Sequence, residues 1–473
     1  MAVSIDQKPL YEVLPIGQKI IFAVSDNVIY STKFKVKYIA QVYVSDSSIL
    51  FNSSELIGTF KTTPNNVGVG IFDLRPILET FVTPDHEANE ILPGNSTYKG
   101  VAASIIPFPI HIVDKYSLNN NTLKFFAVKF LVEFSDTETG NIIAPGESGN
   151  TNNAVNSDQY TMFNGVLQYD DVLTRSLFTD NYGYNLEDFE LTDSDSKFLT
   201  NAPTTQYARL TDYGTLSFLN YVPPNSGGSN IDVDSITIKY YKADGSSAGS
   251  DDAITNTAAT GGAASSGNAR TRLSYFGAYP ANLQNWSSNF ATAVTNDLAY
   301  YTVQAQATNL SQLYTINIIC DNERGYEGIR LTWLNQWGVW DYYTFNMKSV
   351  RTVTTNRTSY TQIDGTWNES TFNIAGYKGG KKNFRVNSTE KLRINTDFVT
   401  EAEGVWFEEL INSTEVYIVN GFSADASNTI TNKYIEPVTV TTSSYIRKTK
   451  ANNKLMQYTI EIEKSKMKRT QSV

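Results

Sequence analysis

Hydrophobic and polar residues alternate along most of the chain, which is the pattern of β-strands. In KFKVKYIAQVYV, residues 33–44, every second residue is apolar, and three lysines and a glutamine stand between. We predict a half-buried strand here. Its apolar face comprises Phe34, Val36, Tyr38, Ala40, Val42 and Val44, and its polar face mostly Lys33, Lys35, Lys37 and Gln41. Residues 122–134, TLKFFAVKFLVEF, are apolar on both faces near the centre, so we expect this strand to be covered on both sides.

Six further segments carry strand patterns: SITIKYYKA, YYTVQAQAT, YTINIICD, EVYIVNG, PVTVTTSSY and LMQYTIEIE. Helical patterns are few. Residues 73–82 begin at Asp73, a good N-cap, and place apolar residues at helical spacing. That apolar face comprises Leu74, Ile77, Leu78 and Phe81. Another, weaker helical pattern lies within residues 281–298.

A short helix is also predicted over residues 401–412. Thr400 and Glu403 stand at the spacing of a capping box, in which each side chain satisfies a free backbone N–H at the start of the helix. The large apolar residues Trp406, Phe407 and Leu410 should face inward.

These patterns predict a mainly β protein: several domains of β-sandwich or barrel-like antiparallel sheets with a few short helices. A chain of 473 residues is expected to form about three domains. We predict an N-terminal β domain over 1–135, a polar loop over 136–158, a central β domain over 159–360 and a C-terminal β domain over 361–473. Residues 243–269 are almost entirely small or polar, so we predict a mobile insertion that joins no core unless a neighbouring subunit orders it.

The segment IRLTWLNQWGVWDYYTF, residues 329–345, contains three tryptophans. Its pattern predicts a hairpin of two strands joined by the turn NQWG, with apolar and other residues alternating along each strand. Aromatic pairs across strands stabilise a hairpin by roughly 0.2–1 kcal/mol each. The alternation favours packing over a surface for stacking sugars or bases, and Trp333 and Trp340 are expected to be buried. Trp337 stands at the turn and is the residue predicted to be exposed, where it would contact a partner or a glycan.

The overall charge argues against a nucleic-acid-binding protein. The net charge is −10, whereas duplex binding needs a basic surface. The basic run KSKMKRTQSV, residues 464–473, is more typical of a solvated tail. The single cysteine, Cys320, excludes a disulfide within the chain. No stretch approaches the length of a membrane span, and residues 1–19 lack the basic start and apolar core of a signal peptide, so we expect synthesis in the cytoplasm without classical export.

Catalytic and metal-binding motifs are poorly represented. His86 and His111 lack metal-ligand spacing and are expected to be surface or satisfied residues. GSSAG, residues 245–249, matches the pattern of a nucleophile elbow but lies in a small-residue loop with no helix after it, so we interpret it as chance. The acidic run at 187–195 lacks the glycine and final glutamate of a calcium loop. Paired glycosidase carboxylates stay open, because they meet in space and not in sequence. We predict no cofactor, no metal site and no catalytic residue.

Several segments, taken in order, resemble structural proteins of tailed bacteriophages, namely those of marine, Bacteroidetes-infecting and crAss-like phages. The most specific is RLTWLNQWGVWDYYTF, which is similar to a pattern Arg-Leu-x-Trp/Phe-Leu-Asn-x-x-Gly-x-x-Asp-x-x-Thr-Phe. The others are FKVKYIAQVYV, NNVGVGIFDLRPILETFV, KFLTNAP, YGTLSFLNY, EGVWFEELINSTEVYIVNG and EPVTVTTSSYIRKTKANNKLMQYTIEIEKS. The resemblance covers most of the chain outside residues 136–158 and 243–269.

The resemblance implies a virion protein of the tail, tail hub or neck, synthesised in the host cytoplasm. Its expected partners are copies of itself in a homo-oligomeric ring and other tail, neck or fibre proteins, with no membrane and no nucleic acid. It implies no catalytic residues. Two alternatives stay open: a receptor-binding module that contacts host glycans, and a polysaccharide-degrading enzyme.

Overall fold

The computed structural model describes residues 3–9, 12–88, 97–98, 101–102, 109–167, 196–220, 233–256, 268–307, 310–320, 325–367, 369–374, 376–420, 435–446 and 456–469. Within them the protein is mainly β, with several largely antiparallel sheets and a few short helices, as predicted. The chain divides into two compact units. The first comprises Met1–Ile318, Leu334–Asp341 and Phe422–Thr431, and the second Ile319–Trp333, Tyr342–Gly421 and Asn432–Val473.

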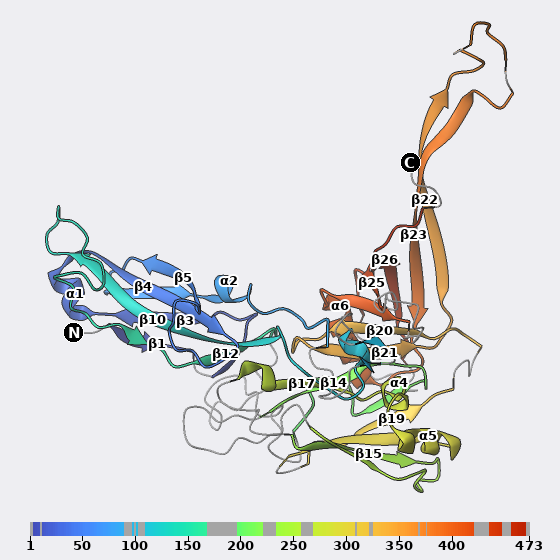
Figure 1. Ribbon diagram of the computed structural model, residues 1–473, viewed down its shortest axis with the longest axis horizontal. Helices are drawn as coiled ribbons and strands as arrows, with labels where there is room; N and C mark the ends of the chain where they lie inside the picture. The colour runs from blue at the N-terminus through green and yellow to red at the C-terminus, as the bar shows by residue number, and fades with distance from the viewer. Residues whose placement is uncertain are drawn as a thin grey trace. The chain divides into compact units, whose positions relative to one another are not determined.

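The first unit begins with two sheets that enclose a common core (Figure 1). One is three-stranded, with the order β1 (Ser4–Gln7), β3 (Ile21–Ser25) and β6 (Val69–Asp73). The other has the order β2 (Val13–Pro15), β12 (Tyr160–Phe163), β10 (Leu123–Ser135), β4 (Phe34–Ser45) and β5 (Leu56–Thr62), with β11 (Val155–Asn156) beside β10. Phe22 of β3 and Phe130 of β10 meet in this core, with ring centroids 5.4 Å apart.

The alternation predicted for residues 33–44 is confirmed along most of β4. Val36, Tyr38, Ala40 and Val42 are all buried. The two ends of this face differ, because Phe34 is 45% exposed and Val44 is half-buried. Lys35 beside Phe34 has φ of 54°, the left-handed region, which interrupts the extended backbone at the start of the strand. Strand β10 is buried on both faces over most of its length, as predicted.

Two further sheets belong to the first unit. A five-stranded sheet has the order β13 (Thr205–Ala208), β19 (Tyr314–Ile318), β18 (Tyr300–Gln306), β15 (Ser235–Tyr241) and β16 (Asp252–Thr255). A three-stranded sheet has the order β14 (Thr215–Leu219), β17 (Leu273–Gly277) and β9 (Tyr116–Leu118). A short pair, β7 (Thr97–Tyr98) and β8 (Val101–Ala102), stands apart. The helical elements are α1 (Asn27–Thr32), α2 (Arg75–Leu78), η1 (Ile110–Ile112), η3 (Ala269–Thr271), α4 (Pro280–Gln284) and α5 (Ser288–Thr295).

A seven-stranded sheet forms the second unit, apart from the hairpin tip that belongs to the first (Figure 1). Its order is β21 (Trp340–Phe345), β20 (Ile329–Leu334), β24 (Val416–Val419), β25 (Ile435–Val440), β26 (Thr459–Lys464), β23 (Gly380–Asn395) and β22 (Val350–Gln362). Helix α6 (Glu401–Asn412) covers one face, and its Trp406 packs against Trp333 of β20 with ring centroids 4.9 Å apart. The predicted domain boundary at 360/361 falls inside β22 and coincides with no edge of either unit.

The predicted helices are confirmed in place but not all in length. Helix α6 spans residues 401–412 and carries the complete capping box of Thr400 and Glu403. The expected third helix is present as two, α4 and α5. The prediction over 73–82 is wrong at both ends. Helix α2 begins at Arg75 with Leu74 as its N-cap, and Asp73, the predicted N-cap, accepts instead a hydrogen bond from the N–H of Arg75 at 3.2 Å. Beyond Leu78 the backbone continues in tighter turns, with the N–H of Phe81 donating to the carbonyl of Leu78 at 3.0 Å.

The prediction that residues 243–269 join no core is wrong for the part that the structure describes. Strand β16 pairs with β15, and Ala248 and Ile254 are buried. Asp252 fixes this strand, since its carboxylate accepts hydrogen bonds from Tyr240 Oη at 2.6 Å and Asn289 Nδ2 at 2.8 Å. The small-residue composition gave no indication of this backbone pairing or of the contacts of Asp252. Residues 257–267 lie outside the described residues.

The predicted polar loop over 136–158 is attached to strand β10 and is not a freely moving segment. The N–H of Ile143 donates to the carbonyl of Phe134 at 2.7 Å. Asn150, which is buried, donates from Nδ2 to the carbonyl of Val132 at 2.9 Å. A polar composition therefore did not prevent order here, because the backbone groups of β10 supplied the partners.

Candidate interaction surface

Trp337, the residue predicted to contact a partner or glycan, is buried, so that prediction is wrong. Its exposed fraction is 3%. Asn335 organises the turn, since its Oδ1 accepts hydrogen bonds from the N–H of Trp337 at 3.0 Å and of Val339 at 3.2 Å, while its Nδ2 donates to the carbonyl of Leu199 at 2.9 Å. Gly338, at φ of 74°, lies so close to Asn164 that a Cβ would overlap the carbonyl of that residue. The turn is thus packed, and its indole offers no stacking face.

The other two tryptophans of the hairpin are buried, as predicted. Trp333 and Trp340 are 0% and 2% exposed. Trp340 donates from Nε1 to the carbonyl of Asp85 at 2.8 Å and lies between the two histidines of the chain. The ring of His86 is 5.5 Å and that of His111 5.0 Å from the Trp340 ring, centroid to centroid. The histidines therefore pack on an aromatic ring, and no group of three metal-ligating side chains occurs among the described residues.

Asp85 is the most deeply buried carboxylate with a shifted pKa. It accepts hydrogen bonds from the N–H groups of Asn120 and Asn121, from Thr122 Oγ1 at 2.9 Å and from Tyr275 Oη at 3.1 Å. Burial raises its pKa, and these hydrogen bonds oppose that rise. Both oxygens are occupied by groups of the protein itself, so we interpret Asp85 as an anchor that joins strands β10 and β17.

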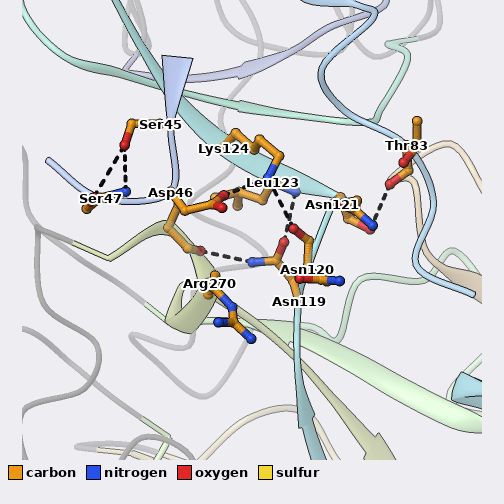
Figure 2. A network of polar contacts seen from close by, with 12 residues as sticks. Ser45, Asp46, Ser47, Thr83, Asn119, Asn120, Asn121, Leu123, Lys124 and Arg270 are labelled. Carbon is orange, nitrogen blue, oxygen red and sulfur yellow. Dashed lines mark hydrogen bonds and ion pairs between the residues drawn. The ribbon is translucent and has the colours of Figure 1, made fainter. Parts of the chain in front are cut away.

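Figure 2 shows the polar contacts that continue from this anchor along the turn before β10. Asn119, fully buried, donates from Nδ2 to the carbonyl of Ala269 at 2.9 Å and accepts from the N–H of Leu123 at 3.0 Å. Lys124 donates to Asp46 at 2.6 Å, and the carbonyl of Asp46 accepts from the N–H of Ala269. These contacts join the turn before β10 to Ala269 and Asp46, so we interpret them as a structural network.

The remaining motifs considered in the sequence analysis do not form a catalytic or binding site among the described residues. In GSSAG, Ser247 donates its hydroxyl to the carbonyl of Gly249 at 2.6 Å inside the turn between β15 and β16, so the motif is followed by a strand and not by the helix of a nucleophile elbow. The acidic residues 187–195 lie outside the described residues. The described tail residues 465–469 are exposed, as expected of a solvated tail, although Lys468 contacts Glu390 and Arg469 Nε donates to Asn387 at 2.7 Å.

A cluster of exposed apolar side chains lies at the end of the hairpin of β22 and β23, which we call the arm. In Figure 1 these orange strands extend beyond the other strands of their sheet. Their register pairs Val350 with Arg393 at the base and Gln362 with Gly380 at the far end. Strand β26 pairs with β23 from Lys391 to Asn395, and Lys468 forms one further bridge to Ser388. Beyond Ser388 the arm is a two-stranded ribbon of about 8 residues a strand, roughly 25 Å long at about 3.3 Å per residue.

The loop at the end of the arm, residues 363–379, carries five large apolar side chains that face solvent. Their exposed fractions lie between 65% and 79%, and they are Ile363, Trp367, Phe372, Ile374 and Tyr377. A hydrogen-bonded core holds the loop: Thr366 Oγ1 donates to the carbonyl of Thr371 at 2.8 Å and accepts from the N–H of Asn373 at 2.7 Å. Phe372 lies against Gly365, whose φ is 75°. The rings are thus presented by a folded turn.

The base of the arm is fixed by charges. Glu390, 6% exposed, lies 2.5 Å from Lys468, 3.8 Å from Lys464 and 3.9 Å from Arg351, nitrogen to oxygen. The hydrogen bond from Lys468, helped by Lys464 and Arg351, holds the pKa of Glu390 below its ordinary value. The arm therefore leaves the sheet from a clamped base.

Comparisons with known proteins assign neither a family nor a function to this chain. No protein-family model matches the chain, and no curated protein matches it. Among solved structures, Salmonella alpha-2-macroglobulin reacted with methylamine is similar at 9% sequence identity with a TM-score of 0.17. The match covers 97% of this chain and 22% of that one, so the chain spans under a quarter of that protein. A TM-score this low supports no statement about fold or function. No helix among the described residues is long and apolar enough to cross a membrane.

Proposed function

We propose that this protein is a structural component of a bacteriophage virion, in the tail, tail hub or neck. There it assembles with copies of itself and with other tail, neck or fibre proteins, supports tail or fibre attachment and catalyses no reaction. The observation that carries the proposal is the arm. It adds to the ordered set of segments, from residue 34 to residue 465, that resemble phage structural proteins.

The arm supports assembly because its energetics favour a partner. A two-stranded ribbon alone is marginally stable in water. Every described side chain from Val350 to Thr361 is exposed, so this strand adds almost no burial in the isolated chain. Clustered exposed apolar residues such as those of the tip are typical of interaction sites. A subunit built to hold neighbours would use such an element.

Complementation of a phage that lacks the gene tests the proposal. Wild-type protein should restore complete particles, whereas particles made without it should have missing or detached tails, because the joint is absent. Negative-stain micrographs and the protein composition of purified particles provide the readout, and host-polysaccharide cleavage should be absent in every preparation. Intact, fully tailed particles made without this protein would exclude the structural role.

A receptor-binding role is the second candidate, and the exposed rings of Trp367 and Tyr377 favour it. They are 67% and 78% exposed, as sugar-stacking rings must be. If this role is correct, Trp367→Ala should give complete, tailed particles that adsorb poorly to the host and should abolish binding to a glycan array. If Trp367→Ala particles adsorb normally, this candidate is wrong.

A further inference from the structure

We propose that the arm docks head to tail on the remainder of a second copy of this chain, which carries a net negative charge. This inference deepens the proposed function and rests on it, because it names the partner and the chemistry of one subunit contact. The contact would have an apolar centre, formed by the side chains of the tip, and a basic collar.

Charge identifies the occupant. Residues 353–386 contain five basic and two acidic side chains, a net charge of +3. Because the whole chain carries −10, the remaining residues together carry −13. The basic side chains are Arg357, Lys378, Lys381, Lys382 and Arg385. Two arms side by side would repel each other, whereas an arm against the remainder of another copy is attracted. Complementary charge of this kind steers association and suppresses wrong orientations.

The tip supplies the apolar centre. Large aromatic residues such as Trp367, Phe372 and Tyr377 are the side chains that most often dominate interface energies when they enter a pocket. Folding of the tip around Thr366 removes part of the entropy that would otherwise oppose docking, since the loop is already ordered before it meets a partner.

The clamped base presents the arm to a partner. Glu390 and its three cations, together with the pairing of β23 to β26, fix the direction in which the arm leaves its sheet. An arm held in this way beyond its sheet is available to a second copy. The donor surface (the arm) differs from the acceptor surface, so the contact is heterologous when each arm docks on the next copy and the exchange is not reciprocal. Such contacts close into rings when the rotation between subunits permits it.

Two variants of the purified full chain test the contact. In the first, residues 358–385 are replaced by Asn-Gly, which joins the paired residues Arg357 and Val386 through a two-residue turn. In the second, Lys381 and Arg385, both exposed, are changed to glutamate. The matched control reverses two exposed lysines outside the arm, Lys19→Glu and Lys239→Glu.

Sedimentation velocity over a concentration series measures self-association. We expect wild type and the control pair to associate, the shortened arm to stay monomeric with an unchanged Tm, and the charge-reversed arm to associate at least about tenfold more weakly. Raising salt from about 0.1 M to about 1 M, over which the Debye length falls from about 10 Å to about 3 Å, should weaken wild-type association.

Three results would overturn the inference. The first is a wild-type chain that is monomeric at every concentration, and the second is a shortened-arm variant that associates as wild type does. The third is a monomeric chain that sediments with anionic phosphatidylglycerol vesicles only when the arm is present, which would make a lipid surface the partner.

Complementation separates failure of this inference from failure of the proposed function. If the shortened-arm protein restores complete tails while particles without the protein lack them, the structural role stands and the arm contact is wrong.

Discussion

Trp406 and Trp333 join helix α6 to strand β20, and neither side chain is more than 3% exposed. Phe407 and Tyr343 extend the same aromatic cluster, with their ring centroids 4.8 Å apart. Packing of this kind depends on shape, so removing one ring leaves a cavity that the neighbours fill only in part.

Trp406→Ala should therefore destabilise the second unit by about 3–5 kcal/mol, the usual cost for a large buried aromatic. Urea unfolding monitored by far-UV circular dichroism measures this loss. The matched control is Trp367→Ala, the same change at a side chain that is 67% exposed, which should leave the midpoint unchanged. Equal midpoints for Trp406→Ala and wild type would show that the helix is not held by this ring.

At the scale of the element, the clamp at the base of the arm depends on pH. The pKa of Glu390 is depressed in the folded protein, from an ordinary value of 4.5, chiefly by the hydrogen bond from Lys468. A depressed carboxyl pKa means that the stabilising contribution is complete above the unfolded value and is lost as the pH falls through the folded value.

Glu390→Gln should cost about 1 kcal/mol at pH 7, a modest value because Lys468 is itself exposed to solvent. The difference in unfolding free energy between wild type and this variant should shrink as the pH falls from 7 to 3. Urea titrations of both proteins at each pH measure it. A difference that stays constant over this range would mean that the carboxylate does not support the base.

The sequence predicted strands where apolar and polar residues alternate, as in β4, or where both faces are apolar, as in β10, and it failed where both faces are polar. Strand β4 was recognised because lysine alternates with large apolar residues. The arm was not recognised, because RTVTTNRTSY presents polar and β-branched residues on both faces and so has no contrast of period two. Both faces are polar for a physical reason: neither packs on a core.

The sequence predicted the exposed tip of the arm, residues 363–379, even less well than the two strands that carry it. Trp337 and Trp367 are the same residue type beside turns, yet one is 3% and the other 67% exposed. The difference arises from Asn164, Leu199 and other residues distant in sequence that cover the first turn. Local pattern carries no information on which turn a distant segment covers.

At the scale of the whole molecule, each unit has its own core, so unfolding should not be a single two-state event. Calorimetry should resolve two transitions. Trp406→Ala should lower the temperature of one of them, and Asp85→Ala should lower the other, because it leaves the donors around Asp85 unpaired at a cost of about 1–3 kcal/mol each. One transition shifted by both variants would show that the units unfold together.

The strand order of the second unit also determines how the arm would bear a mechanical load. In the described part of the sheet, β22 pairs only with β23, and β23 is joined to the other strands through five residue pairs with β26. Leu392, Ile394, Ile460 and Ile462 are buried along this joint. A pull along the arm acts at right angles to those hydrogen bonds and loads all of them together in shear, whereas a sideways pull would open them one after another. Tension along the arm thus meets the joint in its most resistant direction.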